Sequence, residues 1–445
     1  MTKTTQNVNK KFVALMLSAI LIASSALIVV SVKPANAALS VKKGSFDTIT
    51  CNPPTAACDH TISEIGFQPE ALILFTNVDL IPNSGFQAEY NIGIGFSDGT
   101  NDRSISARSE DNQGTSDTGR IASETSILKV LDKTSNTVTL EAGLTSFNAD
   151  GSFTITYSAG KSGTGASVQY IALGGADITD VKVDTITSGT TAGDVDYTTV
   201  GFQPNFVMFM YTRQNQADVA QNHAELGLGF ASSSSEEGAL VVVSEDGENT
   251  SDTHRAQLTD SVIYQLTPST GNQNAQADFV SFITNGFTLH WSDLPNNTDD
   301  KFYYMAIKGG KYKVGAFTQP TTGTAPFNQN VTGVGFQPTG LLLASFNHEA
   351  ASTIQTQSRL SFGASDGTND GAMWAGDKDN VGTTDTAEYN DASKVIRLAT
   401  EPSTTDAEAE LESFNADSSG RFMLKWTTRN DATAREIIYI ALGNT

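Results

Sequence analysis

Acidic residues recur as close sets at three places in the sequence, and such sets could hydrolyse a glycosidic bond. The sets are Glu110-Asp111 with Asp117, Glu245-Asp246 with Asp252, and Lys378-Asp379 with Asp385. A glycosidase needs two carboxyl groups that face one sugar. Because a lysine replaces the glutamate in the third set, we expect Asp117, Asp252 and Asp385 to bond backbone amides in turns, and we expect no enzymatic activity.

Two further acidic segments could bind calcium. Asp98 and Asp102 flank Gly99-Thr100-Asn101, and Asp366 and Asp370 flank Gly367-Thr368-Asn369. Clustered carboxylate and amide oxygens are ligands that Ca²⁺ prefers. A hairpin turn at Asp-Gly explains the same residues without a metal, so both interpretations stay open. We expect no other cofactor.

The sequence has two cysteines, Cys51 and Cys58, which are separated by the turn-forming Asn52-Pro53-Pro54. In an exported protein they are expected to form one disulfide that closes a short loop, worth roughly 2–3 kcal/mol. A metal site is the alternative, but only His60 lies nearby as a further ligand.

The N-terminus has the form of a secretory signal. Lys3, Lys10 and Lys11 precede an uncharged run from Phe12 to Val32, and Ala35-Asn36-Ala37 fits the rule for signal peptidase. We therefore expect residues 1–37 to form a signal helix that is removed, leaving a secreted or cell-surface protein. The uncharged run is long enough to span a bilayer, so an uncleaved anchor is the alternative. No second run of this length follows.

The composition excludes several partners. The formal net charge is −22, and 17% of the residues are charged. An acidic protein of this kind has no electrostatic attraction to nucleic acid or to anionic lipid.

The chain contains three copies of one unit. Gly-Phe-Gln-Pro begins at Gly66, Gly201 and Gly335, and each copy continues into an apolar run and ends on a tyrosine-containing strand pattern. We divide the chain into repeat 1 (residues 38–175), repeat 2 (176–310) and repeat 3 (311–445).

The pattern inside each copy predicts β-strands. Apolar residues alternate with polar ones, as in Ala407, Ala409 and Leu411, and Asp-Gly and Asn-Gly turns separate the short runs. We expect an all-β protein of three tandem antiparallel β-sandwich domains, each resembling a jelly roll. The apolar run after Gly-Phe-Gln-Pro should be a central strand that is covered on both faces. Each copy should bury its own core and fold alone.

These motifs together resemble tandem β repeats of uncharacterised bacterial surface proteins and phage virion proteins. The resemblance rests on Gly-Phe-Gln-Pro, the Thr-Ser-Asp-Thr segments at Thr115 and Thr250, and the closing Tyr-Ile-Ala-Leu-Gly at Tyr170 and Tyr439. It covers all three copies and implies display on a surface or particle, with no known activity or site residues.

The combined expectation is a non-enzymatic binding or structural protein whose ligand is a glycan or a surface protein. Linked weak sites gain avidity, whereas an active site gains little from triplication. One strand face differs between copies, and we expect it to look outward or toward a neighbouring domain. If it looks outward, Trp374, Ser106, Arg108 and Val241 are the candidate ligand-binding residues, and the alternative is that Trp374 fills a domain junction. The alternatives are a polysaccharide-degrading enzyme and a self-associating shell, filament or virion component.

Overall fold

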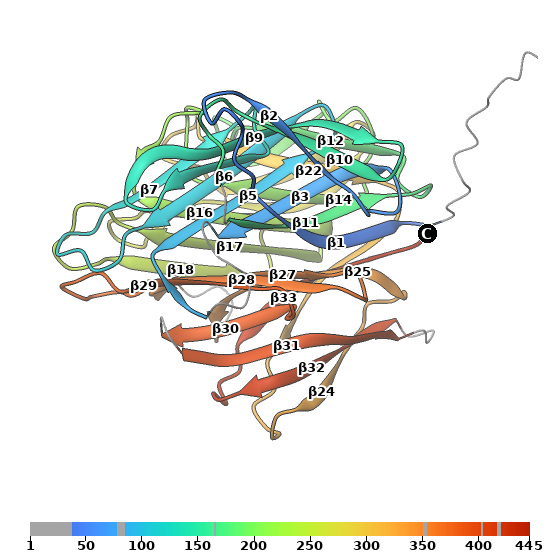
Figure 1. The fold of residues 1–445 in the computed structure, drawn as a ribbon. Coiled ribbons are helices and arrows are strands. Elements are labelled where there is room, and N and C mark those ends of the chain that lie inside the picture. The colour runs from blue at the N-terminus through green and yellow to red at the C-terminus, as the bar shows by residue number, and fades with distance from the viewer. Residues whose placement is uncertain (1–37, 78–84, 164–165, 350–353, 402–403, 416–419) are drawn as a thin grey trace, which may run out of the picture. The chain divides into compact units, whose positions relative to one another are not determined.

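The computed structural model describes residues 38–77, 85–163, 166–349, 354–401, 404–415 and 420–445 (Figure 1). Within these ranges the chain forms strands and turns and no helix, which confirms the all-β class. None of the described residues therefore form a helix that could cross a membrane. The signal helix expected at residues 1–37 lies outside the described part.

Each repeat contributes eleven strands in the same order. Repeat 1 contains β1 (Ser40–Asp47), β2 (Cys58–Ile62), β3 (Pro69–Asn77), β4 (Gln87–Ala88), β5 (Tyr90–Ser97), β6 (Asp102–Ser109), β7 (Thr118–Ser123), β8 (Leu128–Asp132), β9 (Ser135–Asn148), β10 (Ser152–Tyr157) and β11 (Ser167–Gly174). Repeat 2 contains β12 (Asp180–Ile186), β13 (Gly193–Tyr197), β14 (Phe206–Tyr211), β15 (Gln221–Asn222), β16 (Ala224–Ser233), β17 (Glu236–Ser244), β18 (Thr253–Leu258), β19 (Ile263–Leu266), β20 (Gln273–Ile283), β21 (Gly286–Asp293) and β22 (Phe302–Lys308). Repeat 3 contains β23 (Lys311–Thr318), β24 (Phe327–Thr332), β25 (Pro338–His348), β26 (Gln355–Thr356), β27 (Ser358–Ser365), β28 (Asp370–Asp377), β29 (Thr386–Asp391), β30 (Ile396–Glu401), β31 (Thr404–Asn415), β32 (Arg421–Arg429) and β33 (Glu436–Gly443).

Every repeat is a sandwich of one large and one small antiparallel sheet. In repeat 1 the large sheet has the order β1-β11-β3-β5-β6-β7-β15, and the small sheet has the order β2-β10-β9-β8. The sheets of the other two repeats have the same orders with the corresponding strands. The last strand of each large sheet, β15 in repeat 1, comes from a different repeat.

The Gly-Phe-Gln-Pro motif leads into the middle of the large sheet. Gly66, Gly201 and Gly335 have φ angles of +86°, +88° and +84°, a region that glycine adopts without steric cost. The following strands β3, β14 and β25 lie between two neighbours of their own sheet. They are buried on both faces, as the absence of polar alternation predicted.

Each repeat has an apolar core of its own between its two sheets. In repeat 1 this core contains Leu72 and Leu74 of the central strand together with Phe153 and Ile155 of the small sheet. Repeats 2 and 3 have corresponding cores around Trp291 and Trp426.

A further core is shared by all three repeats. It is built from the opposite faces of the large sheets and includes Ile73, Met208 and Leu342 of the three central strands. Phe75 of repeat 1 contacts Phe362 of repeat 3 edge to face, with ring centroids 5.1 Å apart. The chain from Ala37 to Thr445 is consequently one compact unit. This shared core argues against the expectation that each repeat folds alone, because part of the apolar surface of each repeat is covered by the other two.

Short strands link the three repeats into a closed ring. β15 of repeat 2 pairs with β7 of repeat 1, and β26 of repeat 3 pairs with β18 of repeat 2. β4 of repeat 1 pairs with β29 of repeat 3 and completes the circle. The three repeats are thus arranged like the subunits of a cyclic trimer joined in one chain.

Candidate functional site

The acidic loops considered for catalysis hold neighbouring repeats together. Oδ1 of Asp246 accepts a hydrogen bond from the backbone amide of Thr118 at 2.8 Å, and Oδ1 of Asp379 accepts one from Thr253 at 2.9 Å. Asp111 accepts the third from Thr386, at 2.8 Å. These three amides belong to another repeat than the aspartate. The expectation of bonds to backbone amides concerned Asp117, Asp252 and Asp385, and it is wrong for them because their carboxylates face basic side chains.

The other aspartates of these sets pair with basic side chains. Asp117 accepts from Arg108 Nη2 at 2.5 Å, Asp252 lies 2.6 Å from His254 Nε2, and Asp385 lies 3.6 Å from Lys378 Nζ. The acidic sets therefore contribute to turns and junctions.

Asp98 and Asp366, proposed as calcium ligands, also bond backbone amides between repeats. Oδ1 of Asp98 accepts from the amides of Thr100 and Asn101, and Oδ2 accepts from Val183 of repeat 2 at 2.8 Å. Asp366 makes the same turn and accepts from Lys43 of repeat 1 at 3.1 Å.

Asp102 and Asp370 join the two sheets of their own repeats. Asp102 accepts from the Leu144 amide at 2.7 Å, and Asp370 accepts from the Leu411 amide at 2.8 Å. Burial raises the pKa of Asp102 to about 6. Among the described residues, no group of three or more His, Cys, Asp or Glu side chains could hold a metal ion.

The strand face considered for ligand binding is covered by a neighbouring repeat, so the ligand-binding interpretation is wrong and the alternative of a domain junction holds. Trp374 is 2% exposed and packs with Ala387 and Ala399. The ring of Phe86 from repeat 1 packs edge to face against it, with centroids 5.4 Å apart. The indole therefore cannot serve as an exposed platform for a sugar.

The equivalent residues of the other repeats are covered too. Val241 is buried with Leu258 and Leu266. Ser106 is fully buried, and Arg108 is 1% exposed, with its Nε donating to Asn136. The face differs between copies because each copy fills the same interior space with different side chains.

The disulfide between Cys51 and Cys58 is confirmed, and both residues lie beside the core of repeat 1.

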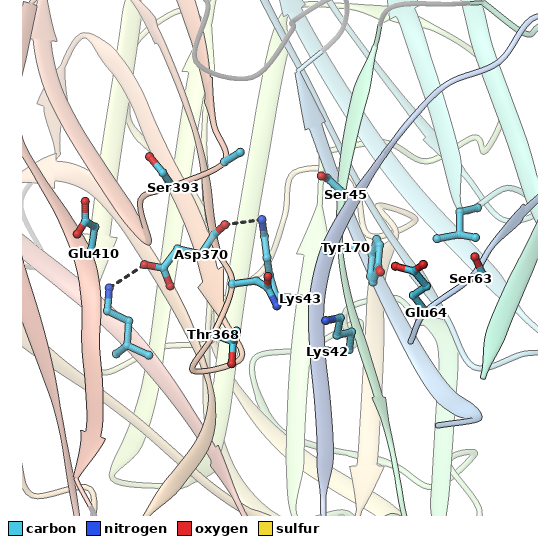
Figure 2. Close-up of a pocket in the computed structure, with 15 residues that line it drawn as sticks. Lys42, Lys43, Ser45, Ser63, Glu64, Tyr170, Thr368, Asp370, Ser393 and Glu410 are labelled. Atoms are coloured by element: carbon cyan, nitrogen blue, oxygen red, sulfur yellow. Dashed lines mark hydrogen bonds between the residues drawn. The ribbon is translucent and has the colours of Figure 1, made fainter. Parts of the chain in front are cut away.

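An open cavity of about 620 Å³ lies where repeat 1 meets repeat 3 (Figure 2). It is a surface site that sequence reasoning missed. Figure 2 shows the Lys43 side chain between two walls, with Thr368, Asp370, Ser393 and Glu410 of repeat 3 on one side and Ser45, Ser63, Glu64 and Tyr170 of repeat 1 on the other. Most of these side chains end in a hydroxyl or a carboxylate.

Lys43 is a buried basic group between the two walls of this cavity. It is 3% exposed, and its Nζ donates to the backbone carbonyl of Asp370 at 2.6 Å. Burial lowers the pKa of Lys43 to about 8, against the opposing effect of Asp370 and Asp366. Burial likewise raises the pKa of the Asp370 carboxyl.

The carboxylates on the two walls have different surroundings. Glu410 is 2.6 Å from Lys394 Nζ and 3.9 Å from Lys425 Nζ, so two cations fix its position. Glu64 is exposed and faces the cavity from repeat 1. The cavity therefore offers exposed acceptors, several hydroxyls and the ammonium group of Lys42.

A comparison of the three repeats could have indicated Lys43. The backbone amides of Lys43, Val183 and Val314 make equivalent bonds to the preceding repeat, and both valines are core residues. A lysine where the other two copies have a buried valine indicates an unusual site. The sequences can be aligned at this position only when the strand register is known. A related cavity of about 470 Å³ lies between repeats 2 and 3 at Ser232, Glu236 and Lys313.

Comparisons with known proteins identify no family. No family model matches the chain, and no curated protein matches it significantly. Among solved structures, the LG1-3 region of the laminin alpha2 chain aligns with 87% of this chain and 93% of its own length, at 10% identity and a TM-score of 0.08. An alignment with a score this low supports no argument about fold or function.

Proposed function

We propose that this protein is an exported, non-catalytic binding protein that takes a carbohydrate in the cavity between repeats 1 and 3. The observation that carries the proposal is the lining of that cavity, where hydroxyls and charged groups from two repeats converge on one open space of about 620 Å³. Sugar hydroxyls both donate and accept hydrogen bonds, and this lining supplies partners for both. The Cys51–Cys58 disulfide fits export to an oxidising environment.

The surroundings of the carboxylates in this cavity favour binding over hydrolysis. A glycosidase needs a protonated carboxyl as general acid opposite an ionised one. The Glu410 carboxylate already pairs with Lys394 at 2.6 Å and lies 3.9 Å from Lys425. The Asp370 carboxylate already accepts a hydrogen bond from the backbone amide of Leu411.

The test is binding of the mature full-length protein to a glycan array, followed by calorimetric titration of any ligand found. We expect Glu64→Gln to weaken binding at least tenfold. The matched control is Asp260→Asn, an exposed carboxyl in repeat 2, which should leave affinity unchanged. Equal binding by wild type and Glu64→Gln would refute this site.

The same preparation separates the alternatives. Release of reducing ends from a polysaccharide panel, lost in Glu64→Gln, would identify an enzyme. Particles or filaments on electron-microscope grids would instead favour a self-assembling component.

A further inference from the structure

A third cavity, of about 450 Å³, lies where repeat 1 meets repeat 2. Arg120 of β7 enters it from repeat 1, and Arg213, His223 and Asp300 line it from repeat 2. Arg120 is held in place because its guanidinium donates to the carbonyls of Asn222, His223 and Arg213. One side of the cavity is therefore fixed by the ring of strands.

Asp300 and Arg213 present unused hydrogen-bonding capacity in this cavity. Asp300 is 2% exposed, and its Oδ2 has no hydrogen-bond partner among the described residues. The nearby Gln265 side chain partly offsets the rise that burial causes in the pKa of Asp300. Gln265 Nε2 itself has no hydrogen-bond partner among the described residues. The Arg213 guanidinium donates no hydrogen bond to any residue of the described chain and interacts with Asp300 only through its charge. A buried acceptor without a donor is costly unless something fills the space beside it.

The corresponding position between repeats 2 and 3 has no unpartnered carboxylate like that of Asp300, although Asn347 Oδ1 and Arg435 Nε lack hydrogen-bond partners among the described residues. The strand registers place Arg435 where repeat 2 has Asp300, and Asn347 where it has Arg213. Arg435 donates to Glu349 at 2.9 Å and to Asp431 at 2.7 Å. Asn347 donates to the carbonyl of Ala399 at 2.6 Å. The open polar cavity between repeats 1 and 2 is thus not a general consequence of the fold.

The charges around the cavity favour an anion. Glu225 lies fully buried beside Arg120 and Arg213, and burial raises its pKa to about 8, so it is largely neutral at neutral pH. Asp300, whose pKa is raised by burial to about 6, is mostly ionised there. Burial lowers the pKa of His223, and burial raises the pKa of Glu245 at the cavity edge. Two arginines consequently face one buried carboxylate.

We propose that this cavity binds a small carboxylate that carries a hydrogen-bond donor next to its carboxyl group, as amino acids and sugar acids do. The carboxylate pairs with Arg213, whose planar guanidinium matches it, and the adjacent ammonium or hydroxyl donates to Asp300. Thr267, Ser269 and Asn297 supply further hydrogen-bonding groups at the opening. This site is separate from the proposed saccharide site, so neither depends on the other.

The experiment titrates the full mature chain with L-serine, D-glucuronate, acetate and glucose, using calorimetry at pH 7. We expect L-serine or D-glucuronate to bind at least tenfold more tightly than acetate, and glucose to show no binding at this site. A preference for L-serine identifies amino acids as the ligand class, and a preference for D-glucuronate identifies sugar acids.

Two variants locate the binding. Arg213→Gln should weaken the preferred carboxylate at least tenfold, and Asp300→Asn should remove its advantage over acetate. Arg429→Gln is the matched control because Arg429 is a half-buried arginine outside this cavity that donates to the carbonyl of Thr321 in repeat 3. Glu64→Gln should leave this affinity unchanged, which separates this site from the saccharide site. Absence of carboxylate binding up to 10 mM, or binding that persists in both cavity variants, would overturn the proposal.

Discussion

Oδ1 of Asp111 in repeat 1 accepts a hydrogen bond from the backbone amide of Thr386 in repeat 3, and the two atoms are 2.8 Å apart. These residues are far apart in sequence, yet the bond repeats those between adjacent repeats at Asp246 and Asp379. The Asp111 bond is therefore part of the non-covalent closure between the first and last repeats.

Asp111→Ala should lower the free energy of unfolding by about 1–3 kcal/mol, because it leaves the Thr386 amide without its charged acceptor. Denaturant titration of the full chain measures this loss. Asp385→Ala is the control, since Asp385 lies in the equivalent loop but makes only a half-exposed ion pair with Lys378. If the two variants lose the same free energy of unfolding, the bond between Asp111 and Thr386 contributes no more than a surface ion pair.

Repeat 3 alone should not fold as a monomer. Cutting residues 311–445 from the chain exposes Leu342, Phe362 and Ile440, which pack in the shared core. Exposed apolar surface of this kind causes self-association or loss of cooperative folding. Sedimentation and calorimetry of the truncated protein check this. A monomer with one cooperative melting transition would contradict it.

Trp374→Ala should destabilise the full chain by about 3–5 kcal/mol, as expected for removal of a buried aromatic side chain. The reason is the contact with Phe86 of repeat 1 and the burial of the indole. Val280→Ala is an appropriate control because Val280 is 36% exposed, and surface changes cost little. A Trp374→Ala protein as stable as this control would show that the indole is not part of the interior.

The three repeats and their β structure were predictable from sequence because local residue patterns encode them. Gly66 and its counterparts specify a positive φ, and the apolar runs that follow specify a central strand. The two faces of β28 were also predictable, because Met373 and Ala375 do lie in the shared core. Variation at Trp374 indicated either exposure or a contact with a neighbouring domain, and local sequence could not decide between them because the covering residue, Phe86, belongs to repeat 1.

The ring and the cavities were not predictable because they depend on pairings with little sequence signal. The exchanged strands β4, β15 and β26 are two residues long, which is too short for any alternation to appear. The cavity at Lys43 exists only because repeat 3 lies beside repeat 1. Lys43 by itself is an ordinary lysine near the start of a strand.

The last prediction concerns pH, because several carboxyl groups are buried in the interior. Burial raises the pKa of Glu225 to about 8 and the pKa values of Glu237 and Asp377 to about 7. In the unfolded chain such groups titrate near 4, so between about pH 5 and pH 8 the folded state holds more protons than the unfolded state. Stability must then fall as pH rises through this range.

We expect the wild-type protein to unfold at a lower denaturant concentration at pH 8 than at pH 5. Glu225→Gln removes the largest of these contributions, since neither Glu225 oxygen has a hydrogen-bond partner among the described residues. The variant should gain about 1–3 kcal/mol over wild type at pH 8 and little at pH 5, where the carboxyl is already neutral. Asp260→Asn, at an exposed site, should follow the wild-type pH dependence. An unchanged pH dependence in Glu225→Gln would show that Glu225 is ionised throughout and balanced by Arg120.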